Sequence, residues 1–147
     1  MSLKSKAPVV ARTVLGAIFF TSGLNWFLNF MPAPPPTGRA ADFFAGLHAS
    51  GYLLPLLRST ELAAGFSLLA GRFVPLALTI LAPVVVNIIA FHLFLAPETI
   101  PVPLAVVGLG LYLAWTERAA FSPLFRARGT RPAASREHPR DAAGVAA

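Results

Sequence analysis

The sequence predicts an all-α fold, an integral membrane four-helix bundle with a short interfacial helix between the first and second spans. Hydrophobic residues make up 56% of the 147 positions and charged residues only 12%, with a mean hydropathy of +0.68. This composition is typical of membrane proteins, and the length fits a single domain. The apolar residues also gather into four runs that can form membrane helices, at residues 8–31, 52–70, 73–96 and 102–118.

Composition and charge argue against cysteine-based chemistry and against nucleic-acid binding. The chain has no cysteine, so it cannot form a disulfide, a thiolate nucleophile or a thiolate metal site. The net charge of +6 is concentrated in short loops and in residues 121–147, with no basic face interleaved with aromatic residues, so nucleic-acid binding is not favoured. We predict that residues 121–147 form a disordered basic cytoplasmic tail that is attracted to anionic lipids.

The first span begins like a signal peptide, with Lys4 and Lys6 before an apolar run. The run continues to Met31 without a small-x-small cleavage site, which predicts an uncleaved signal-anchor that remains as the first span. Trp26 fits the membrane interface or helix packing. The second half of the span has a polar stripe on one helical face, formed by Thr21, Asn25 and Asn29 with Ser22 beside them.

A proline-rich connector at residues 32–38 separates the first span from a short amphipathic run at residues 43–50. Asp42 is predicted to be the N-cap of this run. Phe43, Phe44 and Leu47 would lie on one side of it, which predicts an interfacial helix over the mouth of the bundle.

Glycine and proline residues predict the turns, the bending and the packing of the later spans. Gly71-Arg72 is too short for anything but a tight turn, so the second and third spans should run antiparallel. Pro83 is expected to kink the third span. Gly108 and Gly110 would allow another helix to approach the fourth span closely.

Orientation follows from the basic residues near the span ends. Arg39 lies on one side together with acidic Asp42 and Glu98, while the opposite side carries Lys4, Lys6, Arg12, Arg72, Arg118, Arg126 and Arg128. We therefore expect a multi-pass protein of the bacterial inner (cytoplasmic) membrane with both termini in the cytoplasm.

Arg58 and Glu61 are the most informative residues because they fall inside the second span, with Glu61 near the bilayer midplane. An ionisable side chain at that depth costs about 3 kcal/mol, so it must face protein, water or a ligand. At about 1.5 Å of rise per residue, Asn25, Asn87 and His92 fall in the same outer half of the membrane. The sequence thus predicts a polar cavity toward the outer leaflet.

Each of these groups also has a purely structural interpretation. Arg58 and Glu61 at i, i+3 can simply neutralise each other, and Asn25 and Asn87 can be interhelical hydrogen-bond partners. His92 can be an ordinary hydrogen-bonded histidine. His48 and His92 alone give little support for zinc or haem, so no metal is expected.

Two stretches, LAGRFVPLAL at residues 69–78 and LAPVVVNIIAFH at residues 81–92, resemble the DoxX family of small bacterial four-span membrane proteins. The likeness includes FTSGL at residues 20–24 and the membrane glutamate Glu61, and it covers about residues 10–118. The resemblance implies a four-helix membrane bundle. Named members look like subunits of thiosulfate:quinone oxidoreductase, and others are linked to thiol or oxidative-stress systems. The missing cysteine argues against a thiol relay in this chain.

Three functions remain open. The first is a membrane subunit that binds a quinone or similar amphiphile for a partner redox subunit, as expected of a subunit of a quinone-linked oxidoreductase. Glu61 and Arg58 would then be the catalytic pair, and the headgroup would contact Asn25, Asn87, His92, Trp26, Phe91 and Tyr112. The second is a non-enzymatic assembly, chaperone or lipid-binding subunit, or a homo-oligomer. The third is a small-solute or proton transporter.

Overall fold

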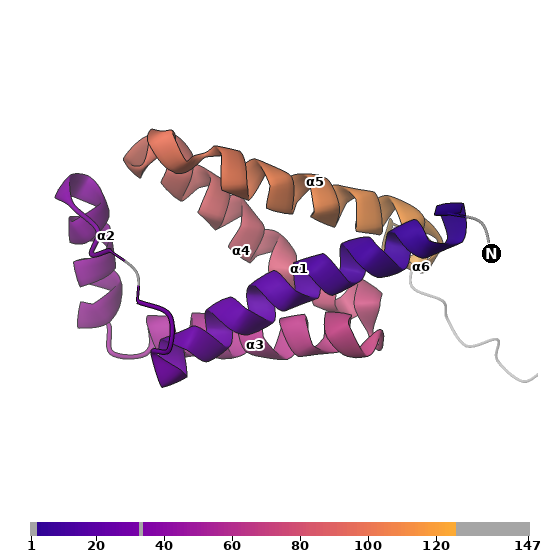
Figure 1. Ribbon diagram of the computed structural model, residues 1–147, viewed down its shortest axis with the longest axis horizontal. Helices are drawn as coiled ribbons and strands as arrows, with labels where there is room; N and C mark the ends of the chain where they lie inside the picture. Colours follow the sequence, from indigo (N-terminus) through magenta and orange to yellow (C-terminus); the bar gives the residue numbers. More distant parts are fainter. Residues whose placement is uncertain (1–2, 33, 126–147) are drawn as a thin grey trace, which may run out of the picture.

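The computed structural model describes residues 3–32 and 34–125, and in these residues it consists only of helices, turns and extended connectors (Figure 1). The long helices are α1 (Leu3–Leu28), α3 (Leu53–Ala70), α4 (Val74–Leu95) and α5 (Pro101–Thr116). Helices α1, α3 and α4 contain segments long and apolar enough to cross a membrane, while α5 is a shorter apolar helix. The prediction of an all-helical membrane bundle is confirmed.

Helices α1 and α3 form the tightest packed pair, and glycine allows this close approach. A Cβ atom on Gly23 would lie 2.8 Å from the carbonyl oxygen of Arg58, and one on Gly65 would overlap the backbone of Phe20. Gly16 likewise packs against the backbone of Leu69. Small residues at such crossings allow backbone-to-backbone contact, which gives van der Waals attraction between membrane helices.

Helix α1 ends three residues before the predicted limit at Met31. Asn29 adopts a left-handed conformation with φ of 49°, and its N–H donates to the carbonyl of Asn25 at 2.7 Å. Asparagine tolerates this conformation better than most residues, so it ends the helix there.

Helix α2 (Gly38–Ala49) lies across one end of the bundle (Figure 1). It begins earlier than predicted, with Thr37 at the N-cap position, so Asp42 lies inside the helix and its predicted capping role is wrong. The reason is that Arg39, Ala40 and Ala41 are good helix formers, which lets the helix start as soon as the proline-rich connector ends.

The turn between α3 and α4 is as tight as predicted. Gly71 has φ of 68°, its N–H donates to the carbonyl of Leu68 at 3.1 Å, and the N–H of Arg72 donates to the carbonyl of Ser67 at 3.1 Å. This pair of bonds is a Schellman motif, which requires a left-handed residue and so favours glycine. Helix α4 then continues through Pro83.

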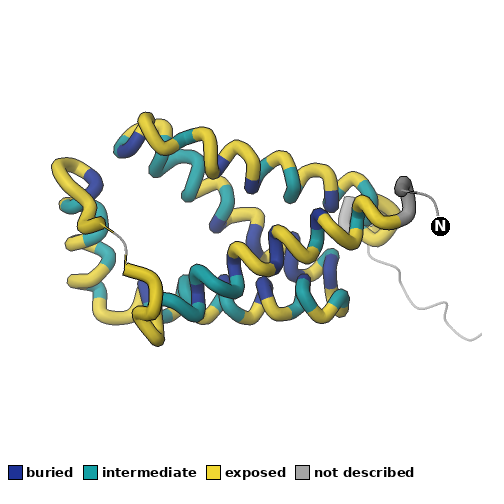
Figure 2. Tube along the Cα trace, viewed as in Figure 1, coloured by how far each residue is buried: buried dark blue, intermediate teal, exposed yellow. Residues whose placement is uncertain are grey.

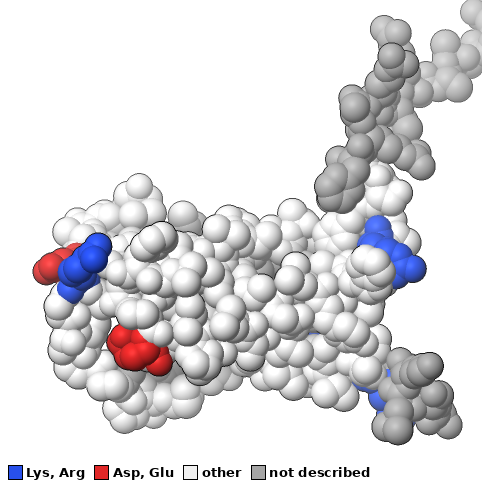
Figure 3. All heavy atoms as spheres, turned by 90° about the horizontal axis from the view of Figure 1, so that it is seen from above, with Lys and Arg blue, Asp and Glu red and all other residues white. Residues whose placement is uncertain are grey.

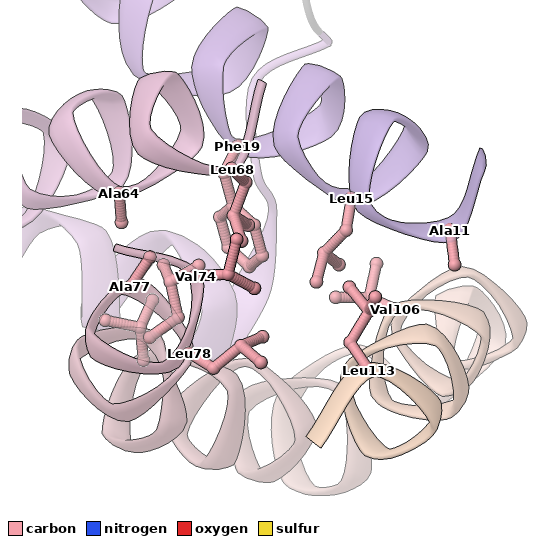
Figure 4. Close-up of a cluster of buried hydrophobic side chains, with 12 residues drawn as sticks. Ala11, Leu15, Phe19, Ala64, Leu68, Val74, Ala77, Leu78, Val106 and Leu113 are labelled. Carbon is pink, nitrogen blue, oxygen red and sulfur yellow. The ribbon is translucent and has the colours of Figure 1, made fainter. Parts of the chain in front are cut away.

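The apolar core lies mainly in the half of the bundle away from α2 (Figure 2), and Figure 4 shows its side chains in close-up. All four long helices contribute to it, and Leu15, Leu68, Leu81 and Leu113 are its most deeply buried large side chains. The cluster consists of Ala11, Leu15, Phe19, Ala64, Leu68, Val74, Ala77, Leu78, Leu81, Val84, Val106 and Leu113. Toward α2 fewer residues are buried (Figure 2).

The chain continues beyond α5 into two short turns, α6 (Arg118–Phe121) and the 3-10 helix η2 (Ser122–Phe125). Phe121, the first residue of the predicted tail, packs against the core. Positions 126–147 of that tail lie outside the described residues. A further 3-10 turn, η1 (Pro97–Thr99), connects α4 to α5.

On the face seen in Figure 3, the charged side chains lie at the two ends of the bundle and the surface between them is uncharged. Arg39, Asp42 and Glu98 belong to the end with α2 and η1, whereas Arg72 and Arg118 follow the opposite ends of α3 and α5. The apolar flanks between them fit contact with lipid.

Candidate functional site: a buried ion pair beside two cavities

Glu61 is the only charged residue among the buried ones in the described part of the chain, with 3% of its surface exposed. Its Oε2 accepts a hydrogen bond from Nη1 of Arg58 at 2.7 Å, one turn earlier on α3. The side chain of Arg58 is 22% exposed. Since an unpaired buried carboxylate is very costly, this contact explains how α3 can carry both residues inside the membrane.

The ion pair also connects two helices. Nη1 of Arg58 donates a second hydrogen bond to Oγ of Ser22 on α1, at 3.0 Å. The close contact at Gly23, which touches the backbone of Arg58, holds Ser22 within reach. The guanidinium is therefore held by one partner on its own helix and one on the neighbouring helix.

Next to this pair is a cavity of about 380 Å³, called here the central cavity. Its polar lining consists of Ser22, Arg58, Glu61, Asn87 and His92. Its apolar lining consists of Ile18, Phe19, Phe43, Phe44, Leu47, Leu57, Val84, Ile88, Phe91, Val102, Pro103 and Val106. A mostly apolar pocket of this size with a few convergent polar groups is typical of small-molecule sites, which span roughly 300–1,000 Å³.

Helix α2 forms one wall of the central cavity through an aromatic cluster. The ring centroids of Phe43 and Phe44 each lie 5.4 Å from that of Phe91 on α4, and 5.7 Å from each other. Such tilted and edge-to-face arrangements are favourable for aromatic pairs. The two phenylalanines were predicted to lie on one side of the short helix, and in the structure both line the central cavity.

His92 has a defined tautomer in this environment. Its Nδ1 lies 2.7 Å from the carbonyl oxygen of Ile88, one turn earlier on α4. A carbonyl can only accept, so Nδ1 carries the proton, and in the neutral ring Nε2 is a free acceptor. His92 can therefore accept a proton or hydrogen bond from a ligand in the cavity that it lines.

A second and more open cavity of about 590 Å³, called here the flank cavity, also has Arg58 in its lining. It is lined by Ala17, Ile18, Thr21, Ser22, Asn25, Trp26, Met31 and Arg58. Ile18, Ser22 and Arg58 line both cavities.

The structure brings five of the predicted site residues together, because Arg58, Glu61, Asn87, Phe91 and His92 all line the central cavity. The other three lie elsewhere. Asn25 and Trp26 line the flank cavity, and Tyr112 is 40% exposed on α5 and lines neither cavity.

Asn25 has a local structural role instead. Its Oδ1 accepts from the N–H of Met31 at 2.6 Å, and its Nδ2 donates to the carbonyl of Met31 at 3.0 Å. Asparagine near a helix end commonly bonds to the nearby backbone in this way.

Three further residues that line the central cavity were not predicted as site residues from the sequence: Ser22, Phe43 and Phe44. Ser22 was visible as part of the polar stripe of the first span, but its contact with Arg58 depends on how α1 is rotated against α3. The sequence did predict that the two phenylalanines of α2 lie on one apolar side of that helix. In the described part of the chain no three His, Asp or Glu side chains gather as a metal site would require.

The family model DoxX matches residues 7–93, which include all of α2 and α3 and most of α1 and α4. The match ends before α5, whereas the resemblance noted in the sequence was expected to extend to about residue 118. Neither a curated protein nor a solved structure matches the chain. Since the matched residues are more than half of the sequence, this chain belongs to the DoxX family.

Proposed function

We propose that the protein binds the headgroup of a quinone or a similar amphiphile in the central cavity and serves a partner redox subunit in the bacterial cytoplasmic membrane. The observation that carries the proposal is the Arg58–Glu61 pair, which lies at the edge of a cavity that also contains Asn87 and His92. An ion pair with a purely structural role would require neither the adjacent cavity nor the polar side chains of Asn87 and His92.

The lining fits a quinone headgroup in both its polar and apolar parts. Quinone oxygens accept hydrogen bonds, and the amide of Asn87 and the guanidinium of Arg58 can donate them. Phe43, Phe44 and Phe91 provide aromatic surface for a planar ring.

Reduction of a quinone to a quinol takes up two electrons and two protons. Glu61 and Nε2 of His92 are the groups in the cavity that can exchange protons with the two oxygens. The electrons would come from the redox centre of a partner subunit. In this proposal Glu61 is the proton-transferring group, while Arg58 positions its carboxylate.

The experiment is gentle detergent extraction, followed by mass and visible spectra of the bound small molecules. Wild-type protein is expected to retain quinone, and Glu61→Gln, which cannot exchange the proton, is expected to lower quinone-linked electron transfer in membranes. Glu98→Gln is the matched control, because Glu98 is exposed in η1.

Two results would overturn the proposal: purified protein without quinone, or Glu61→Gln protein with the electron-transfer rate of the Glu98→Gln control. The thermal unfolding of both variants should be measured alongside, so that a loss of fold is distinguished from a loss of proton transfer.

A second function, as a non-enzymatic assembly or lipid-binding subunit, is favoured by α5. Added Cβ atoms on Gly108 and Gly110 would meet nothing within 4 Å, so the close approach that these glycines allow is not used by the described residues. A partner's transmembrane helix could pack there. Copurification of a stable larger complex, with activity indifferent to Glu61 and His92, would favour this function.

Transport is supported by fewer observations. The half of the bundle away from α2 contains the tightly packed apolar core, including Leu15, Leu68 and Leu113. Flux into proteoliposomes that depends on Glu61 would be needed to favour a transporter.

A further inference from the structure

The flank cavity lies directly beside the central cavity. Ile18, Ser22 and Arg58 line both of them, so a single layer of side chains lies between the two spaces. A third cavity of about 280 Å³, formed mainly by α3 and α4, shares no lining residue with the central cavity. A ligand in the central cavity therefore has the flank cavity as its neighbour and not the third one.

The flank cavity follows one side of α1 that faces lipid. Ala17, Ile18 and Trp26, which line it, are all exposed. Helices α1 and α5 diverge toward α2, so α5 does not cover this part of α1 (Figure 1). Arg58 is one turn from Glu61, the residue predicted to lie near the bilayer midplane, and at that depth the surrounding lipid is hydrocarbon. A group that extends from the cavity into the membrane must therefore be apolar.

The side chains of the flank cavity also fit an apolar chain. Several of its polar groups already have hydrogen-bond partners in the described chain, since Asn25 bonds to the backbone of Met31 and Ser22 accepts from Arg58. A hydrocarbon chain in the cavity would leave these bonds intact, so it would not leave those polar groups without partners. The apolar part of the lining consists of Ala17, Ile18, Trp26 and Met31.

The α2 side of the central cavity is less open to such a chain. The rings of Phe43 and Phe44 on α2 each lie 5.4 Å from the ring of Phe91 on α4, measured between centroids. All three rings line the cavity, and their contacts close it between α2 and α4. A tail attached to a headgroup in the central cavity would have to separate these rings to leave by that side.

We infer, on the basis of the proposed function, that the flank cavity binds the apolar tail of the amphiphile whose headgroup occupies the central cavity. Ile18, Ser22 and Arg58 then surround the point at which the headgroup joins the tail. The class of ligand is thereby narrowed to a quinone or similar headgroup that carries a long alkyl or isoprenoid chain.

The test compares two benzoquinones with the same ring substituents, one with a decyl tail and one without, by equilibrium binding to the purified protein in nanodiscs. Ala17→Phe fills the flank cavity and leaves the lining of the central cavity unchanged. Because the added ring occupies the space of the tail, affinity for the decyl quinone should fall at least about tenfold. Affinity for the quinone without a tail should stay within about twofold of the wild-type value.

Ala82→Phe is the matched control, because Ala82 is exposed on α4 and lines neither cavity. It should bind both quinones as the wild type does. Equal affinities of the two variants for the decyl quinone would overturn the tail site, as would an equal loss of both quinones in Ala17→Phe. A wild-type protein that binds neither quinone would instead overturn the proposed function, and the tail site with it.

Photolabelling of the wild-type protein decides the result if Ala17→Phe unfolds. A decyl quinone with a diazirine in its tail is expected to give adducts on Ala17 and Trp26 that the unlabelled decyl quinone competes away. Adducts confined to α2, or to lipid-facing residues such as Phe94, would overturn the tail site.

Discussion

The pairing of Arg58 with Glu61 could be predicted from the sequence, because residues at i, i+3 share a helical face and neither tolerates lipid alone. The contact with Ser22 could not, since it depends on the rotation of α1 about its axis. The hydrogen-bond partner of Asn25 could not be predicted from the sequence either. Its membrane depth suggested a ligand contact, but the end of α1 at Leu28 gave its amide a backbone partner at Met31.

Removing one member of the pair is expected to destabilise the protein strongly. Arg58→Met leaves the Glu61 carboxylate without a partner, and breaking a buried pair in this way typically costs about 3–5 kcal/mol. The double variant Arg58→Met/Glu61→Met removes both charges and should recover most of the lost stability. Thermal unfolding in detergent measures both effects.

The contradicting outcome is a double variant less stable than Arg58→Met alone. Since both variants lack Arg58, that outcome would mean that the carboxyl group of Glu61 stabilises the fold through contacts other than the ion pair.

Among the helices, the composition and lengths of the apolar runs were enough to predict α1, α3 and α4. The contacts between them were harder to predict. Glycines on the fourth span were expected to allow close approach, yet within the described chain the close approach occurs between α1 and α3, at Gly16, Gly23 and Gly65. A glycine in a sequence shows that a helix can be approached closely but does not show which neighbour does so.

Gly65→Ala tests this packing. The added methyl group would overlap the backbone of Phe20, and overpacking of this kind costs roughly 1–3 kcal/mol. Helix propensity alone would make the same change favourable by about 1 kcal/mol. We therefore expect a lower unfolding temperature for Gly65→Ala and an unchanged or higher one for Gly108→Ala, which has open space around it. Equal shifts in the two variants would contradict the α1–α3 contact.

Over the whole bundle, the buried residues concentrate away from α2 (Figure 2). The central cavity lies toward α2, because Phe43, Phe44 and Leu47 of that helix line it. The sequence predicted polar groups at one common depth, and that half of the bundle is where the central cavity lies. It could not predict the size of the cavity or the existence of the flank cavity, because both depend on how far the helix ends separate. The separation of charges between the two ends supports an orientation with α2 outside the cell.

This orientation can be tested by cysteine labelling, since the chain contains no cysteine of its own. Glu98→Cys, in η1 between α4 and α5, should react with a membrane-impermeant maleimide in intact spheroplasts. Arg72→Cys, at the turn between α3 and α4, should react only after permeabilisation. Both positions are exposed, so their reactivity depends on the side of the membrane. The reverse pattern of labelling would contradict the orientation and place α2 in the cytoplasm.

The most direct test of a ligand headgroup beside the Arg58–Glu61 pair is crosslinking with a photoreactive quinone in native membranes, with the adducts mapped by mass spectrometry. If a quinone headgroup binds there, the adducts will be concentrated on residues of the central cavity, such as Phe44, Leu57 and Phe91, and unlabelled quinone will compete them away. Adducts spread over lipid-facing residues such as Leu76 and Phe94, without competition, would contradict it.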